Sequence, residues 1–198
     1  MQFRFEPGSS PALLLLHGTG GDENDLIPLG QLIRPDAALL SSRGEVDENG
    51  QLRFFRRLAP GVFDLDDLIR RTHTLADFVE EQSERHHLRK IVAVGYSNGA
   101  NIAASMLLLR PGILSGAILL RAMVPLEPPH PPDLGDVPVL IIAGRHDEMM
   151  GPDRPQRLAA LLLNAGAEVT LDWLDTGHGL GPADVKRATG WLDQNFPG

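Results

Sequence analysis

The chain has 198 residues, no cysteine and a formal net charge of −8 at pH 7. Its length suits one domain, and 42% hydrophobic with 22% charged residues is typical of a globular protein. The lack of cysteine excludes disulfides, thiolate metal ligands and a cysteine nucleophile. The acidic balance argues against nucleic acid as a partner, because binding phosphates needs a basic surface.

The N-terminus shows no signal-peptide pattern, and no apolar run approaches the 18 or more residues of a membrane helix. We therefore predict a single domain over residues 1–198, located in the cytoplasm and without a membrane partner.

Short apolar runs alternate with amphipathic stretches, which is the pattern of a mostly parallel, doubly wound α/β sheet with helices on both faces. Helices are predicted after Asn24, after the cap Asp64, after Ser97, over Asp153–Asn164 and from Pro182 onward. Strands are predicted at Gln2–Phe5, Ala12–Leu16, Ala38–Ser41, Lys90–Gly95, Gly116–Leu120, Val137–Ala143 and Val169–Leu174.

Two long stretches lack a periodic pattern and are expected to be loops. Ser42–Gly61 is largely polar, and loops of this length are often functional. Val124–Asp136 contains five prolines and joins two predicted strands directly, which leaves no room for a large cap domain.

The apolar strand at residues 91–94 runs into Gly-Tyr-Ser-Asn-Gly, which places Ser97 between Gly95 and Gly99. A serine on a sharp strand-to-helix turn is typical of a hydrolase nucleophile. Two glycines around a serine also occur in ordinary turns, but here a strand precedes the motif and helical spacing follows it. Ser97 is therefore the predicted nucleophile.

A serine nucleophile needs a base, and the base needs an orienting carboxylate. Asp147 follows one predicted strand and His178 follows the next, in the order that hydrolases of this kind use. Asp147 as a turn cap and His178 as a surface histidine are the simpler alternatives, and Glu148 could replace Asp147. The three elements in sequence favour a Ser97–His178–Asp147 triad.

The negative oxygen that forms during such a reaction needs N–H donors. We expect them from Asn98, directly after the nucleophile, and from Thr19 in the loop His17–Gly21, with Gly20 as the next choice. The loop lacks the Gly-Lys-Ser/Thr ending of a phosphate-binding loop, and His17 is expected to organise it. No histidines have zinc-site spacing, so no metal is predicted.

Four motifs carry a resemblance that covers the chain from end to end: residues 16–23, 95–100, 144–147 and 177–180. The chain resembles the phospholipase/carboxylesterase family of the α/β-hydrolase superfamily, which is related to acyl-protein thioesterases. Ser41-x-Arg-Gly followed by Arg-Phe-Phe at 53–55 resembles the hydroquinone-specific or dioxygenase-linked carboxylesterase branch.

The resemblance implies the α/β-hydrolase fold, the triad and oxyanion donors named above, no cofactor and a homodimer. It also implies a shallow substrate site in the Arg43–Arg57 loop. Phe54, Phe55, Arg56 and Gly20 are the candidate substrate contacts, although packing explains the first two equally well.

The predicted function is therefore a serine carboxylesterase that acts on short-chain, small-molecule esters through an acyl-enzyme. Thioester hydrolysis by the same triad is one alternative, and a non-catalytic binding or sensor module on the same fold is another.

Overall fold

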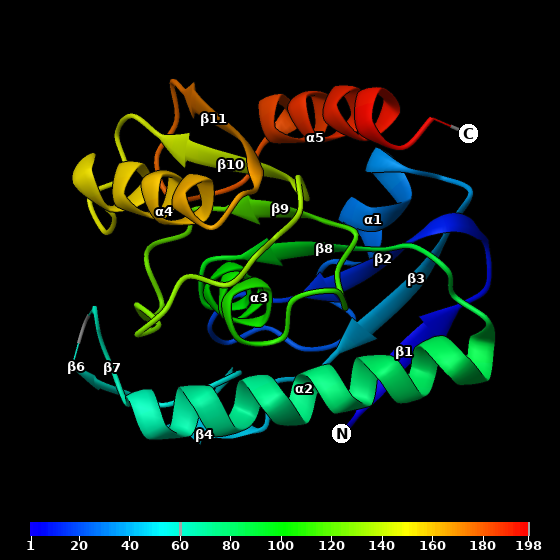
Figure 1. Cartoon of the computed structure of the whole chain (residues 1–198), viewed down its shortest axis with the longest axis horizontal. Coiled ribbons are helices and arrows are strands. Elements are labelled where there is room, and N and C mark those ends of the chain that lie inside the picture. Colours follow the sequence, from blue (N-terminus) through cyan, green and yellow to red (C-terminus); the bar gives the residue numbers. More distant parts are fainter. Residues whose placement is uncertain (60, 198) are drawn as a thin grey trace.

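A seven-stranded sheet forms the centre of the structure, a computed structural model that describes residues 1–59 and 61–197. The strands follow the order β1-β3-β2-β8-β9-β10-β11, which Figure 1 shows from β11 at the top to β1 at the lower right. All pair in parallel except β1, which runs antiparallel to β3. Their bounds confirm the seven predicted strands to within a few residues: β1 Phe3–Glu6, β2 Ser9–Leu16, β3 Ala37–Ser42, β8 Ile91–Tyr96, β9 Gly116–Leu120, β10 Pro138–Gly144 and β11 Glu168–Leu174.

Helices cover both faces of the sheet. Successive strand residues point to opposite faces, so Leu13 packs in the core under α1 and α5, whereas Leu14 packs in the core under α2, α3 and α4. Burial on both faces explains why central runs such as Leu13–Leu16 of β2 are apolar throughout, whereas the edge strands β1 and β11 contain exposed polar residues. The helices are α1 Ile27–Ile33, α2 Leu65–His86, α3 Asn98–Leu109, α4 Asp153–Asn164 and α5 Pro182–Asn195.

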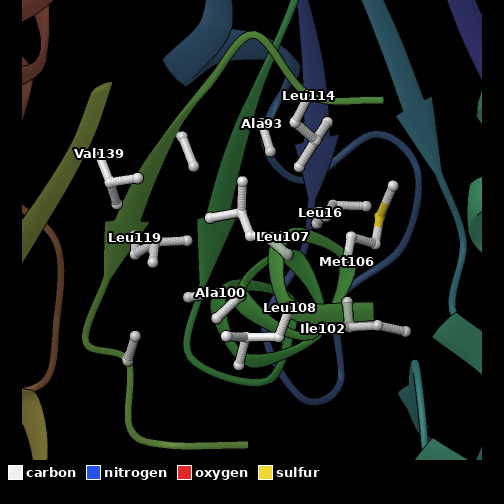
Figure 2. Close-up of a cluster of buried hydrophobic side chains, with 14 of the residues drawn as sticks. Leu16, Ala93, Ala100, Ile102, Met106, Leu107, Leu108, Leu114, Leu119 and Val139 are labelled. Atoms are coloured by element: carbon white, nitrogen blue, oxygen red, sulfur yellow. The ribbon is translucent and has the colours of Figure 1, made fainter. Parts of the chain in front are cut away.

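Helix α3 lies at the centre of the larger core, and all its residues from Asn98 to Leu108 are buried. Figure 2 shows Ala100 and Leu107 of this helix close to sheet side chains such as Leu119. Small alanines on α3 allow the helix to approach the sheet closely. The helix that follows the candidate nucleophile is thus held rigidly by packing on every side.

The segment expected as a loop at Ser42–Gly61 contains short strands, so that expectation was wrong. Strand β4, Val46–Glu48, pairs with β5, Gln51–Arg53, through a turn in which Asn49 and Gly50 both have positive φ. A second hairpin pairs β6, Arg57–Ala59, with β7, Val62–Phe63. An Asn-Gly pair is a strong hairpin signal, so the first hairpin could have been predicted.

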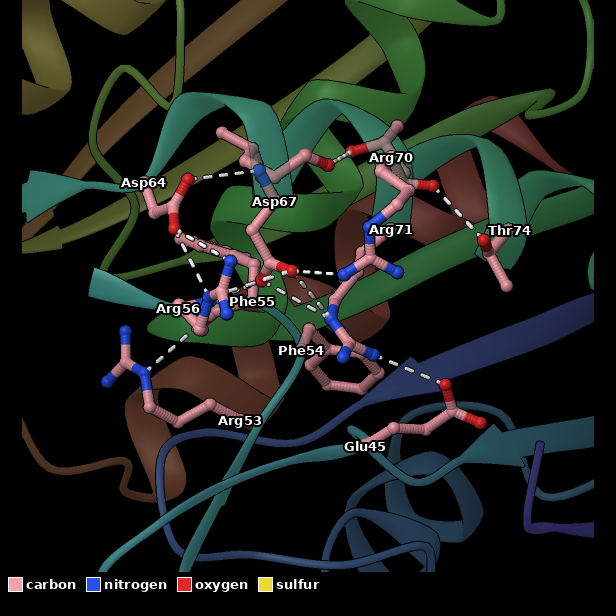
Figure 3. A network of polar contacts seen from close by, with 12 residues as sticks. Glu45, Arg53, Phe54, Phe55, Arg56, Asp64, Asp67, Arg70, Arg71 and Thr74 are labelled. Atoms are coloured by element: carbon pink, nitrogen blue, oxygen red, sulfur yellow. Dashed lines mark hydrogen bonds and ion pairs between the residues drawn. The ribbon is translucent and has the colours of Figure 1, made fainter. Parts of the chain in front are cut away.

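The start of α2 anchors this segment to the body of the protein. Asp64 accepts a hydrogen bond from the Asp67 N–H, as expected of a helix cap. The side chain of Asp67 is fully buried and contacts the guanidinium groups of Arg56, Arg70 and Arg71 (Figure 3). Burial alone would raise the pKa of Asp67, but the Arg56 N–H and these guanidiniums outweigh it and lower the pKa.

Residues 121–137, between β9 and β10, form neither helix nor strand, in agreement with the prolines there. Within the described part of the chain, no helix is long and apolar enough to cross a membrane. Residues 1–59 and 61–197 also contain no group of three histidine, aspartate or glutamate side chains that could hold a metal ion.

Candidate active site

Ser97 occupies a sharp turn between β8 and α3, with φ of 51° and ψ of −109°. Positive φ is rare for a residue with a side chain, and here it is imposed by the neighbouring packing. A Cβ on Gly99 would lie 2.0 Å from the Leu16 carbonyl oxygen, and one on Gly95 would lie 2.5 Å from the Gly99 oxygen. Both flanking glycines are therefore required for the turn.

The sheet brings Ser97, His178 and Asp147 together although they are far apart in the sequence. His178 Nε2 lies 3.1 Å from Ser97 Oγ, and His178 Nδ1 lies 2.7 Å from Asp147 Oδ2. Each follows a different strand: β8 precedes the serine, β10 the aspartate and β11 the histidine. The arrangement has the hydrogen-bond order of a nucleophile, a base and an orienting carboxylate.

The carboxylate of Asp147 is held in place from both sides. Its side chain is 2% exposed, and Oδ1 accepts the N–H of Met149 at 2.9 Å while Oδ2 faces His178. A carboxylate at Nδ1 fixes the proton on that nitrogen and leaves Nε2 free to accept the Ser97 hydroxyl proton. The neighbouring His146 turns away, to the exposed Asp175.

Two backbone N–H groups near Ser97, those of Thr19 and Asn98, have no hydrogen-bond partner among the described residues. Asn98 is the first residue of α3, where N–H groups lack intrahelical partners. The N–H of Gly20 donates to the Leu52 carbonyl, so the second choice for a donor was wrong. Thr19 is held by the Arg53 guanidinium, whose Nη1 donates to Thr19 Oγ1 at 2.6 Å.

His17 organises the loop that carries Thr19, as the sequence predicted. Its Nε2 accepts the Gly44 N–H at 2.9 Å, so the proton is on Nδ1, which donates to the Gly18 carbonyl at 2.6 Å. Burial lowers the pKa of His17 and keeps the ring neutral. Gly18 lies so close to the Tyr96 ring that a Cβ on Gly18 would be 2.7 Å from a ring carbon. The Tyr96 hydroxyl donates to the His178 carbonyl.

A fully buried ion pair, missed in the sequence, lies beneath the loop that carries His178. Arg121 pairs with Asp184 at 2.8 Å, and their side chains are 0% and 1% exposed. The same guanidinium donates to the Gly177 and Gly179 carbonyls, both at 3.0 Å, on either side of the histidine. An arginine directly after an apolar strand was the available signal, because such a residue lies at the same sheet edge as Ser97.

Ser97 opens into a cavity of about 290 Å³. Its lining combines apolar side chains, among them Phe63, with polar groups at the nucleophile, among them Asn98 and Asn101. Asn101 Oδ1 accepts the N–H of the lining residue Met123, and Asn98 Oδ1 accepts the N–H of Phe54, which follows the lining residue Arg53. Helix α3 therefore holds the two segments that contribute Met123 and Arg53 to the cavity. The cavity also has charged lining residues: Arg53, Arg57, Arg154 and Glu148.

None of the four predicted substrate contacts lines the cavity at Ser97, although other residues of the same segment do. Phe54 and Phe55 are 3% and 0% exposed and pack in the core under α2 and α3. Arg56 turns to Asp64 and Asp67 at the start of α2 (Figure 3). These three residues and Gly20 are not among the described residues that line the cavity. Arg53, the last residue of β5, and Arg57, the first residue of β6, line the cavity instead.

Known proteins resemble the chain over almost its full length, although no family model matches it. The protein of Bacillus subtilis (strain 168) named "Putative hydrolase MhqD" is 46% identical over 98% of both chains. The Bacillus cereus carboxylesterase has a TM-score of 0.95 and 45% identity over 99% of this chain and 95% of its own. A carboxylesterase from Mesorhizobium loti has a TM-score of 0.89 and 39% identity, covering 93% and 90%. These similarities confirm the predicted α/β-hydrolase fold, and the chain belongs to the carboxylesterase family of the α/β-hydrolases.

Proposed function

We propose that the protein hydrolyses short-chain carboxylic esters of small molecules through an acyl-enzyme on Ser97. The observation that carries the proposal is the continuous hydrogen-bonded chain from Ser97 Oγ through His178 to Asp147. The membership of the carboxylesterase family supports the ester as the bond that is broken.

In the proposed reaction, His178 Nε2 takes the hydroxyl proton while Ser97 Oγ attacks the ester carbonyl carbon. The N–H groups of Thr19 and Asn98 donate to the oxygen that becomes negative. His178 returns the proton to the alcohol oxygen as the C–O bond breaks, and the acyl group stays on Ser97. A water molecule, deprotonated by His178, then attacks the acyl carbon, and His178 returns the proton to Ser97 Oγ as the acid leaves. Throughout, Asp147 orients the ring and stabilises its protonated form.

The size of the cavity supports small substrates. About 290 Å³ is at the lower end of the ~300–1,000 Å³ that is usual for ligand pockets. The segment between β9 and β10 contributes Met123 to the wall, but it adds no helix or strand that would deepen the site. A short acyl or alcohol group is what such a site accommodates.

The experiment is a panel of phenyl esters of increasing acyl length, assayed with the wild type and single variants. Ser97→Ala and His178→Ala should each lower kcat by about 10⁶-fold, and Asp147→Asn by about 10⁴-fold, as in other serine triads. Asp175→Asn is the matched control, because Asp175 also contacts a histidine but is 85% exposed. Full activity in Ser97→Ala would refute the proposal, and equal turnover of long and short chains would refute the size preference.

Three further features stay predictions. Thioester hydrolysis would use the same three side chains, and kinetics on an ester and its matching thioester distinguish the two activities. A homodimer and a cytoplasmic location are expected from the sequence, and light scattering on the purified protein tests the first.

A further inference from the structure

Positive charge gathers in the cavity at Ser97, although the chain as a whole has a net charge of −8. Three arginines line this cavity, Arg53, Arg57 and Arg154, against one lining carboxylate, Glu148. Esters without charge need no cations around them, and confining guanidiniums together costs energy through their mutual repulsion. The arrangement therefore points to a ligand with negative charge.

Two of the three arginines share a single counter-ion. Glu48 lies 3.0 Å from Arg57 Nε and 3.4 Å from Arg53 Nε. Arg53 is 5% exposed, and its burial together with the charge of Arg57 lowers its pKa, which Glu48 only partly offsets. One carboxylate thus serves two guanidiniums, so the pair retains an excess of positive charge towards the cavity.

Arg154 has no carboxylate within ion-pair distance among the described residues. Its side chain extends from the start of α4 to Gly61 between β6 and β7, where a Cβ on Gly61 would lie 2.9 Å from Arg154 Nη2. Its only polar contact in the described part of the chain is the sulfur of Met123, at 3.4 Å, and a thioether is a weak acceptor. Its donors therefore remain available to a ligand.

The side-chain amide of Asn98, another residue that lines the cavity, has an unpaired donor. Asn98 is 2% exposed, and its Oδ1 is used by the Phe54 N–H, which fixes the orientation of the amide. Its Nδ2 is buried without a partner among the described residues. Buried donors are normally satisfied, so this unpaired donor in a lining residue is a second unusual polar feature of the site.

We propose that the preferred substrates of the Ser97 site are small esters that also carry a carboxylate, which Arg154 and Arg57 bind. This inference rests on the proposed esterase function and specifies its substrate class. A planar guanidinium can donate two parallel hydrogen bonds to a carboxylate, so one free arginine gives both affinity and orientation.

The test compares pairs of esters that differ only in charge. Para-acetoxybenzoate and para-acetoxybenzamide place the carboxylate, or its neutral amide, on the alcohol side. The monophenyl ester of adipic acid and its terminal amide place it on the acyl side. In at least one pair, kcat/KM should be about tenfold or more higher for the carboxylate, which is the effect of one charge-assisted hydrogen bond. The preference should decrease with added salt.

Arg154→Gln should lower that preference by about tenfold. Arg157→Gln is the matched control, because Arg157 lies on the same helix, is 69% exposed and pairs with Glu127 outside the cavity. The control should keep the wild-type preference. Thermal unfolding of both variants checks that the fold is retained.

The outcomes distinguish the carboxylate preference from the esterase function on which it rests. Ser97-dependent hydrolysis with no carboxylate preference in either pair overturns this inference and leaves the esterase function standing. A preference that survives Arg154→Gln refutes the assignment to Arg154. Failure to hydrolyse any of the four esters refutes the proposed function itself.

Discussion

Replacing Arg121 by methionine should both destabilise the protein and slow its reaction. The substitution leaves the Asp184 carboxylate, 1% exposed, without its buried cation. Breaking a buried ion pair by removing one partner costs about 3–5 kcal/mol, which is a large share of the ~5–15 kcal/mol that stabilises a typical domain. For a chain of this length, that corresponds to a decrease in Tm of about 6–20 °C.

The second effect concerns the loop that carries His178. Arg121 donates to the carbonyls of Gly177 and Gly179, so its loss frees the histidine loop on both sides. A displacement of about 1 Å at a reacting group can cost about 100-fold in rate. We expect kcat to decrease by roughly this factor with little change in KM, since Arg121 does not line the cavity.

A double variant separates stability from positioning. Arg121→Met with Asp184→Leu removes both charges, and such apolar replacements of a buried pair are often neutral for stability. Urea unfolding should therefore show most of the stability restored, while kcat stays low because the loop carbonyls still lack their donor. A single variant that loses less than about 1 kcal/mol would refute the reasoning on the buried charge. Recovery of kcat in the double variant would refute the positioning role.

Three further predictions concern other parts of the fold. Gly99→Ala should prevent correct folding, because the new Cβ would lie 2.0 Å from the backbone oxygen of Leu16. Gly190→Ala is the contrasting case, because Gly190 is a helical position with open space around it. This substitution should raise the unfolding free energy by about 0.5–1 kcal/mol in urea titrations. The pKa of His17 is lowered from 6.5, so the stability that the neutral ring contributes is complete above pH 6.5. The unfolding free energy should decrease as the pH falls below 6.5, by at most about 1.4 kcal/mol per pH unit. An equal acid sensitivity in His17→Gln would contradict this prediction. Asp67→Asn should lower the unfolding free energy at neutral pH. It should also remove part of the loss of stability that begins as the pH falls below 3.8, because the pKa of Asp67 is lowered from that value and its contribution disappears as the carboxylate is protonated.

The sheet and its helices could be predicted because the central strands are buried on both faces. Runs such as Leu13–Leu16 are apolar throughout, and the amphipathic α2 between them has a recognisable cap in Asp64. The positions of Asp147 and His178 followed from the same pattern, since strand ends of a parallel sheet meet at one edge.

The wall of the cavity could not be predicted in the same way. Phe54 and Phe55 were candidate ligand contacts because the family resemblance implies a substrate site in their segment, although packing explained them equally well. Their burial depends on contacts with α2 and α3 that only the tertiary fold provides. Arg121 and Asp184 are 63 positions apart, and neither suggests by itself that it would be buried. Pairings of this kind arise only from the tertiary fold.

The sheet order has a consequence for how activity appears during folding. Ser97 and His178 are separated by 81 positions and meet only when β8, β9, β10 and β11 have paired in order. Parallel strands need crossover connections, and contacts of such long sequence separation form late and slowly. Recovery of esterase activity in a refolding experiment would therefore report the completion of the sheet, and secondary structure should return well before the first turnover.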